Sequence, residues 1–269
     1  MTSISNLILI SPGIDLYCEQ HGQGAPALVF VHGGGGWTDH WQLQLPYFAT
    51  LTTVLAYDLR GHGRSSVPVG PYSIETFAED LHRLLSQLQI ERPILVGHSL
   101  GGTIALRYAF DFPDHVTGIA ILDSGCSSTP VSRHVYRELV LARAQEYAKA
   151  QASLQRYNSS PDSGRADFVQ RILAETPAPP PAVINATHFG IITHNNAAAA
   201  SFINCPTLVI GASDMDYWPS MQSWLDYIPH AHLIAIPHSG HYLMLEQPEL
   251  VNAALEEFWQ SVVKEEQGQ

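Results

Sequence analysis

Short, continuously apolar segments that alternate with amphipathic stretches constrain the fold of this chain most strongly. One such segment is Ala27–Val31, and the others are Thr53–Tyr57, Ile94–Val96, Gly118–Leu122 and Thr207–Ile210. Continuous rather than alternating hydrophobicity is typical of strands that are buried on both faces of a parallel sheet covered by helices. The segments therefore predict a doubly wound α/β fold with a mostly parallel sheet.

Further elements fit this prediction. The segments Ile74–Leu88 and Leu100–Phe112 have the apolar faces of helices, and Pro248–Val263 is expected to form the last helix, with proline in its first turn. Two short runs, Leu7–Ile10 and Asp15–Glu19, are separated by a turn sequence that contains proline and glycine. We expect these two runs to form an antiparallel hairpin.

The alternation of strands and helices is interrupted between residues 127 and 204. Helices are expected there over Arg133–Leu154 and Arg165–Ala174, followed by an extended, proline-rich elbow. An insertion after the sixth strand lies over the carboxyl ends of the strands, where open α/β sheets bind their ligands. We therefore expect residues 1–126 and 205–269 to form the core, and the interrupting stretch to form a helical cap.

Composition and charge argue against several classes of protein. Of the 269 residues, 45% are hydrophobic and 14% are charged, so there is enough apolar material for one core. A formal net charge of −12 disfavours nucleic-acid partners, because phosphates bind basic patches. No apolar run approaches the roughly 20 residues that span a bilayer, and no signal-peptide pattern is present. We expect a cytoplasmic protein without nucleic-acid or membrane partners, whose three cysteines are reduced.

One motif indicates the chemistry. The sequence GHSLG at residues 97–101 directly follows the strand Ile94–Val96 and precedes a predicted helix. A GxSxG nucleophile elbow requires this setting of strand, turn and helix, with glycines that avoid backbone clashes. The turn holds the serine hydroxyl out at the carboxyl edge of the sheet, where the amides of a helix N-terminus favour negative charge. Ser99 is therefore the predicted nucleophile.

With this motif, the chain resembles the α/β-hydrolase family over nearly its whole length. The VHGGGGW sequence at residues 31–37 resembles the oxyanion loop of the family, and the DLRGHGRS sequence at residues 58–65 resembles the turn after its fourth strand. The resemblance implies an eight-stranded sheet and an oxyanion hole formed by the backbone amides of Gly34 and Leu100. His32 is then expected to shape the oxyanion loop rather than to act in catalysis.

The resemblance also implies the other two members of a catalytic triad. A serine hydroxyl needs a base, and the base needs a third group that fixes its tautomer. The family places its histidine after a glycine beyond the last strand, which implies His241, with His238 as the alternative. The acid of the family usually follows the preceding strand, which implies Asp214, with Asp216 and Asp123 as alternatives. The two histidines also suggest a metal site, but no further ligands accompany them at a recognisable spacing.

These residues imply a reaction. His241 is expected to take the proton of Ser99, whose oxygen attacks an acyl carbon, and water then hydrolyses the acyl-enzyme without a metal or organic cofactor. A serine nucleophile argues against the dehalogenases and epoxide hydrolases of the family, which use an aspartate there. The expected substrate is a small or medium, largely apolar ester or lactone. The candidate pocket residues are Trp37, Phe189, Ile191, Ile192 and Trp218.

Other functions stay open on the sequence alone. The same fold and similar triads serve carbon–carbon bond hydrolases, hydroxynitrile lyases and cofactor-free dioxygenases, so the fold does not determine the reaction. A small-molecule receptor that retains the fold is a further alternative. A complete triad with both oxyanion donors favours an enzyme, because binding alone does not need all of these groups.

Overall fold

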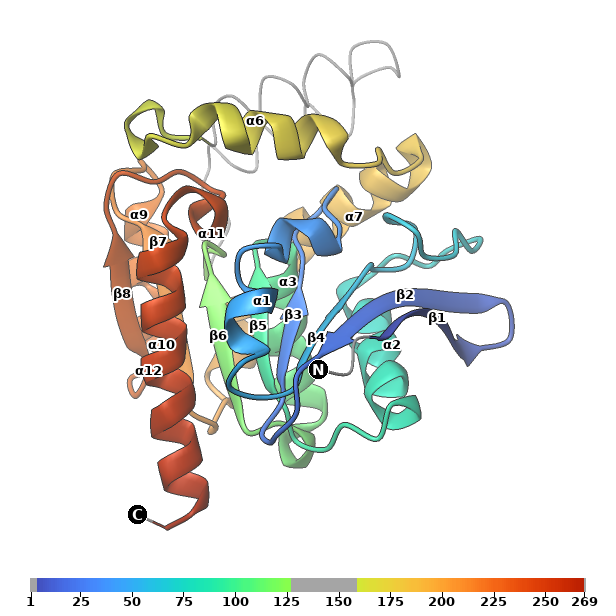
Figure 1. The fold of residues 1–269 in the computed structure, drawn as a ribbon, viewed down its shortest axis with the longest axis horizontal. Helices are drawn as coiled ribbons and strands as arrows, with labels where there is room; N and C mark the ends of the chain where they lie inside the picture. The colour runs from blue at the N-terminus through green and yellow to red at the C-terminus, as the bar shows by residue number, and fades with distance from the viewer. Residues whose placement is uncertain (1–3, 127–158, 269) are drawn as a thin grey trace.

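The computed structural model describes residues 4–126 and 159–268. Its centre is an eight-stranded sheet with the strand order β1-β2-β4-β3-β5-β6-β7-β8 (Figure 1). Strand β2 pairs antiparallel with β1 and β4, and the other neighbouring strands are parallel. The predicted eight-stranded, mostly parallel sheet is confirmed. The strands are β1 (Ile4–Ser11), β2 (Ile14–His21), β3 (Leu28–Val31), β4 (Val54–Tyr57), β5 (Ile94–His98), β6 (Gly118–Leu122), β7 (Thr207–Ala212) and β8 (His232–Ile236).

Helices flank the sheet on both faces, as in a doubly wound fold. Helices α2, α3, α8, α9 and α10 pack on one face, and the short turn η1 with α1, α11 and α12 packs on the other. The helices are η1 (Thr38–Trp41), α1 (Leu45–Phe48), α2 (Ile74–Gln87), α3 (Leu100–Asp111), α6 (Ala166–Glu175), α7 (Pro181–Thr193), α8 (Asn196–Ala200), α9 (Trp218–Gln222), α10 (Trp224–Tyr227), α11 (Leu243–Glu246) and α12 (Pro248–Glu266). None of these helices is both long and apolar enough to cross a membrane.

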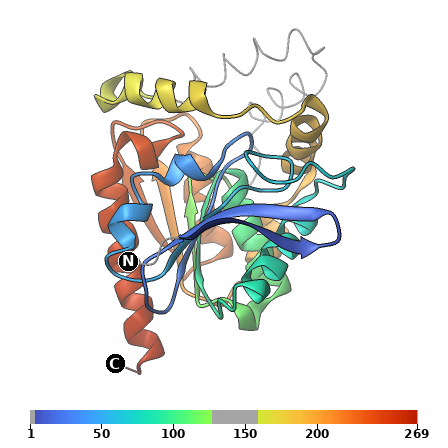
Figure 2. The same ribbon diagram turned by 45° about the vertical axis from the view of Figure 1, so that its right-hand side comes forward.

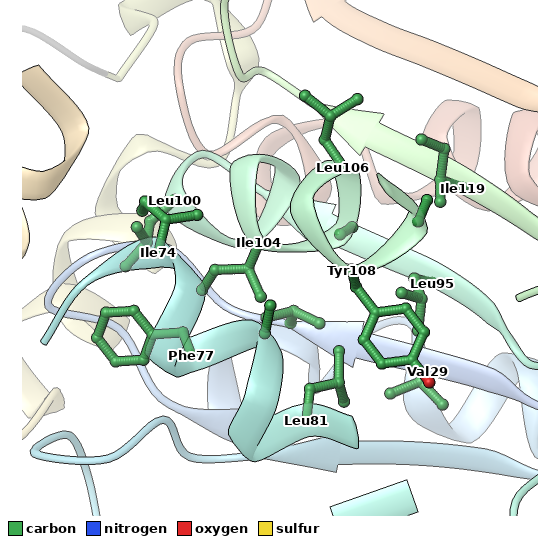
Figure 3. Packing of buried hydrophobic residues seen from close by; sticks show 14 of the residues in the cluster. Val29, Ile74, Phe77, Leu81, Leu95, Leu100, Ile104, Leu106, Tyr108 and Ile119 are labelled. Atoms are coloured by element: carbon green, nitrogen blue, oxygen red, sulfur yellow. The ribbon is translucent and has the colours of Figure 1, made fainter. Parts of the chain in front are cut away.

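Strand side chains point alternately into two apolar cores, one on each face of the sheet. Val29 and Leu95 belong to the core that α2 and α3 cover, where Leu81 also lies (Figure 3). The next residue along β3, Phe30, enters the other core, where its ring lies 5.1 Å from that of Trp41. Because both faces of the central strands are buried, their sequences are apolar without interruption.

Helix α2 illustrates how local sequence fixes an element. Ser73 precedes the helix in an extended conformation, and its hydroxyl accepts a hydrogen bond from the backbone N–H of Thr76 at 3.2 Å. This cap satisfies one of the N–H groups that have no partner within the helix. The buried side of α2 includes Phe77 and Leu81, which are four residues apart and therefore share one face.

Residues 159–204 contribute α6, α7 and α8. Helix α6 lies above the carboxyl ends of the central strands in Figure 1, and Figure 2 shows it on the same side of the sheet. The helix predicted over Arg165–Ala174 is confirmed as α6, and α7 begins at Pro181, at the end of the proline-rich run. The helix expected over Arg133–Leu154 lies outside the described residues, so the boundaries of the cap stay a prediction.

Candidate active site

Ser99 lies at the tip of a sharp turn between β5 and α3. Its dihedral angles are φ 52° and ψ −116°, a combination that is costly for any residue with a side chain. The turn is so tight that a Cβ on Gly97 would overlap the carbonyl of Gly101, and a Cβ on Gly101 would overlap the carbonyl of Val31. The backbone geometry is therefore that of a nucleophile elbow, and the two glycines of the motif make it possible.

Asp123 lies at the corresponding position of the neighbouring strand. Strands β5 and β6 run parallel, with His98 opposite Leu122, so Ser99 and Asp123 are each the first residue beyond their strand. The N–H of Ser99 donates to the carbonyl of Leu122 at 2.9 Å, which joins the two strand ends. The side chain of Asp123 is fully buried, and its Oδ1 accepts a hydrogen bond from the N–H of Ala212 at 3.0 Å. The carboxylate is therefore fixed beside the nucleophile turn.

His241 comes from the loop between β8 and α11 and pairs with this carboxylate. Its Nδ1 lies 2.7 Å from Oδ2 of Asp123. Because a carboxylate only accepts, Nδ1 carries the proton, and in the neutral ring Nε2 has the free lone pair. His98, directly before Ser99, approaches the carbonyl of His241 with Nε2 at 2.7 Å, and the two rings lie 4.5 Å apart. The histidine loop is thus held against the strand end that carries the serine.

The expected pairing of His241 with Asp214 is wrong. The side chain of Asp214 is 48% exposed, and its Oδ2 accepts a hydrogen bond from the N–H of His238 at 2.9 Å. The hydrogen bond from His238 and a second one from Ser213 lower the pKa of Asp214. The loop after β7 therefore directs this carboxylate to the start of the histidine loop, and Asp123, one of the two alternatives, occupies the position beside His241.

The oxyanion loop lies directly against the nucleophile turn. A Cβ on Gly33 would lie 3.2 Å from Cβ of Ser99. The carbonyl oxygen of Gly33 is held by the N–H of Gly36 at 3.0 Å and by Nδ1 of His32 at 2.8 Å. The carbonyl of residue 33 and the N–H of Gly34 belong to one planar peptide and point in opposite directions. The two hydrogen bonds therefore fix the direction of the predicted oxyanion donor.

His32 has a single tautomer in this arrangement. Its Nε2 accepts a hydrogen bond from the backbone N–H of Leu59 at 3.0 Å, so the proton is on Nδ1 and is donated to Gly33. Burial of the ring lowers the pKa of His32 to about 3. A neutral ring at physiological pH supports the expectation that His32 shapes the oxyanion loop.

The second predicted oxyanion donor, Leu100, begins α3. Its N–H is one of the first-turn amides that have no acceptor within a helix. If Gly34 carried a Cβ, three side-chain carbons would be its nearest neighbours. These are Cγ2 of Thr187 at 3.7 Å, Cδ1 of Ile191 at 3.8 Å and Cδ2 of Leu100 at 3.9 Å. The hydroxyl of Thr187 donates to the carbonyl of Val183 in its own helix. The space beside Gly34 is therefore bordered by methyl groups of α3 and α7.

The expected pocket residues do not all border this apolar space. Ile191 borders it, whereas Phe189 is 60% exposed on another side of α7, and its pocket role stays a prediction. Trp37 is half-buried with the guanidinium of Arg64 over its ring, and Trp218 packs against Gly211 at the end of β7. The pocket roles of these two tryptophans stay predictions. The side chain of Ile192 lies outside the described part of the structure.

Two side chains that contact the site were not predicted from the sequence. The phenol of Tyr217 donates to Oδ2 of Asp123 at 2.6 Å, and no local sequence pattern signals this long-range contact. Glu246 is 1% exposed, and its Oε2 accepts hydrogen bonds from Gly240 at 3.1 Å and from Ser160 at 2.9 Å. Burial raises the pKa of Glu246. A glutamate directly after the apolar run of residues 243–245 was the available signal for a buried carboxylate.

The two histidines of the loop do not converge on a common site. His238 contacts Asp214, and His241 contacts Asp123. Within residues 4–126 and 159–268, no group of three or more histidine, cysteine or acidic side chains is arranged to hold a metal ion.

The fold and this site define a class of hydrolases in which a turn after the fifth strand presents the reacting residue. The sequence model described as the alpha/beta hydrolase family matches residues 28–254. The chain therefore belongs to the alpha/beta hydrolase family.

Individual relatives are similar to this chain over different lengths. A protein of Stutzerimonas stutzeri named "Putative carbamate hydrolase RutD" is 30% identical over 252 residues, which cover 89% of this chain and 95% of the relative. The structure of Est816, described as an N-acyl homoserine lactone degrading enzyme, has 28% identity and a TM-score of 0.82 and covers 94% of this chain and 100% of Est816. An uncharacterized protein of Mycobacterium tuberculosis is 40% identical over 100 residues, which are 37% of this chain but only 29% of that protein.

Proposed function

We propose that this protein is a serine hydrolase that cleaves small or medium, largely apolar carboxylic esters or lactones through an acyl-enzyme. The observation that carries the proposal is the 2.7 Å contact between His241 and Asp123, made at the strand end next to the one that carries Ser99. This arrangement supplies a nucleophile, a base with a fixed tautomer and a buried acid. These are the three groups that activation of a serine hydroxyl requires.

The roles follow from the chemistry of each group. His241 Nε2 takes the proton of Ser99 while the serine oxygen attacks the acyl carbon, and Asp123 stabilises the imidazolium that forms. The N–H groups of Gly34 and Leu100 stabilise the tetrahedral oxyanion, each by about 3 kcal/mol. His241 then protonates the leaving alcohol. Water activated by the same ring hydrolyses the acyl-enzyme and regenerates the serine.

The walls beside the oxyanion loop support an apolar acyl group. Methyl groups of Leu100, Thr187 and Ile191 border the space next to Gly34, and the hydroxyl of Thr187 is already used within α7. Apolar walls with few polar groups are typical of pockets that bind apolar ligands. The lactone-degrading activity named for Est816 and the carbamate hydrolysis named for the Stutzerimonas relative fit attack on a carbonyl carbon.

The first experiment tests the nucleophile. We expect the purified protein to hydrolyse p-nitrophenyl acetate and to be labelled by a fluorophosphonate probe, and Ser99→Ala to lose both properties while remaining folded by circular dichroism. If the folded wild-type protein shows neither turnover nor labelling, a receptor or a cofactor-free oxygenase becomes the better interpretation. A panel of esters, lactones, carbamates and vinylogous diketones then identifies the bond that is cleaved fastest.

A second experiment tests the acid. Asp123→Asn retains the shape of the side chain but removes the charge that orients and stabilises the histidine, so kcat should fall by about 10⁴-fold. Asp214→Asn is the matched control, because its exposed carboxylate contacts His238 instead, and its kcat should stay within about twofold of the wild-type value. A large loss of kcat in the Asp214 variant alone would identify Asp214, in the loop after β7, as the triad acid.

A further inference from the structure

The proposed triad leaves one strong contact of its acid without a role. Asp123 accepts three hydrogen bonds from three parts of the chain: Oδ1 accepts from Ala212, and Oδ2 accepts from both His241 and Tyr217. The two bonds to Oδ2 measure 2.7 Å from Nδ1 of His241 and 2.6 Å from the phenol of Tyr217. One oxygen is therefore shared between the proposed catalytic base and a tyrosine that directly precedes α9.

We propose that Tyr217 is a positioning residue that acts through Asp123 and sets the strength of the hydrogen bond between Asp123 and His241. This inference rests on the proposed triad. The carboxylate is fully buried, so protein donors must replace the water that it would otherwise bind. The phenol and the N–H of Ala212 contact different oxygens and together prevent the carboxylate from rotating away from the imidazole.

Sharing of one oxygen also has an electrostatic consequence. A donor that binds a carboxylate withdraws part of its negative charge and so favours the charged form of that carboxylate. The imidazolium of His241 would face more negative charge on Oδ2 if the phenol were removed. Tyr217 therefore moderates the proton affinity of the base as well as aligning it, and it does so through the shared carboxylate oxygen, while its ring lies 6.5 Å from the ring of His241 and perpendicular to it.

Other groups around His241 come from different elements. His98 at the end of β5 contacts the carbonyl of His241, and burial lowers its pKa well below the usual value, so it is neutral. Tyr242 packs its ring 5.5 Å from that of His241. Glu246 of α11 is a second carboxylate near His241 and binds the loop through Gly240. Tyr217 acts on this environment from the side of Asp123, where its phenol donates to Oδ2.

The variant Tyr217→Phe removes the donor and keeps the ring. We expect kcat to fall about tenfold with KM nearly unchanged, because a hydrogen bond to a charged group typically contributes a factor of ten or more. The acidic limb of the kcat/KM profile should move to higher pH by about half a unit, which is a threefold change in proton affinity. The downfield proton resonance of His241 Nδ1–H should move further downfield, since Oδ2 no longer divides its charge between two donors.

Two further variants complete the test. Replacement of Tyr217 by 3-fluorotyrosine, a stronger donor of the same shape, should move the acidic limb to lower pH, opposite to the phenylalanine variant. Tyr227→Phe is the matched control, because Tyr227 is exposed on α10 and should leave kcat, the pH profile and the resonance unchanged. A purely structural role would alter stability without opposite shifts from the two substitutions at position 217.

The outcomes separate this inference from the proposed function. If Asp123→Asn retains activity, the proposed triad itself is refuted. If Asp123→Asn is inactive but folded Tyr217→Phe has wild-type kcat, pH profile and resonance position, the triad stands and the role of Tyr217 is refuted. If Tyr217→Phe loses activity but its pH profile and its resonance are unshifted, the electrostatic role of Tyr217 is also refuted. If Tyr217→Phe does not fold, the 3-fluorotyrosine protein is used instead, and an unshifted pH profile and resonance in that protein refute the electrostatic role.

Discussion

Substitution of Gly34 by alanine tests whether the space beside the oxyanion loop is used by substrate rather than by packing. A Cβ at this position would lie 3.7 to 3.9 Å from its nearest neighbours Thr187, Ile191 and Leu100, which is ordinary van der Waals contact. The methyl group therefore fits the folded protein without strain. Replacement of glycine by alanine at a compatible position typically raises the free energy of unfolding by about 0.4–1 kcal/mol, because it restricts the unfolded chain.

The same methyl group should impair catalysis. The oxyanion must lie about 3 Å from the N–H of Gly34, and the new methyl group stands two bonds from that nitrogen. We expect kcat/KM for p-nitrophenyl esters to fall at least tenfold, about 1.4 kcal/mol of transition-state stabilisation, and to fall more for butyrate and octanoate than for acetate. Urea unfolding followed by tryptophan fluorescence measures stability in the same preparations.

Gly33→Ala is the matched control for this prediction. A Cβ there would lie 2.9 Å from Nδ1 of His98 and 3.2 Å from Cβ of Ser99, so the turn must shift to accommodate it. This variant should lose about 1–3 kcal/mol of stability as well as activity. The reasoning is refuted if Gly34→Ala is destabilised as much as Gly33→Ala, or if it keeps full activity on every chain length.

Three predictions concern buried polar groups. Glu246→Ala should lower the free energy of unfolding by about 3 kcal/mol, because two buried N–H donors lose their acceptor, whereas the exposed Glu249→Ala should cost less than about 1 kcal/mol in the same urea titration. Burial raises the pKa of Glu246, so protonation of the folded state adds stability that is fully present below the unfolded pKa and is lost as pH rises through the folded pKa. The stability of wild type relative to Glu246→Gln should therefore grow as pH falls toward the unfolded pKa of about 4.3. His32 has a lowered pKa of about 3, so the unfolded chain takes up the proton first as pH falls. Wild type should therefore lose about 2 kcal/mol more stability between pH 7 and pH 5 than His32→Gln, and equal losses would contradict a neutral, buried ring.

The fold could be predicted from the sequence because its signals are local. Strands such as Ile94–His98 are buried on both faces and therefore continuously apolar, and the glycines around Ser99 mark a turn that few other residues allow. The histidine loop is also marked by its position between the last strand and a proline that starts α12. Each of these features depends on neighbours in the chain, so the pattern alone indicates them.

The choice of acid could not be predicted in the same way. Asp123 and Asp214 each follow a buried strand within two residues, and the family resemblance favoured Asp214 with Asp123 as an alternative. The structure distinguishes them through tertiary contacts, since Asp123 is held by Ala212 of the neighbouring strand and by Tyr217. These partners are about ninety residues away, and their approach depends on how the loop after β7 packs.

The orientation of α7 was also beyond the sequence. Its residues Pro181–Thr193 are mostly apolar on every side, so no periodicity indicates which face is buried. Packing places Ile191 beside Gly34 and leaves Phe189 exposed. The sequence did not predict this helix, and its contacts depend on the surface that it covers.

The hydrogen bond between Ser99 and Leu122 joins the two parts of the proposed machinery that the central strands carry. Nucleophile and acid extend from two adjacent, hydrogen-bonded strands and can shift relative to each other only if the centre of the sheet deforms. The imidazole of His241 and the predicted oxyanion donor Gly34 lie on loops. The alignment of the imidazole therefore depends on the few hydrogen bonds that attach residues 237–242 to their surroundings, such as the contact of His98 with the carbonyl of His241.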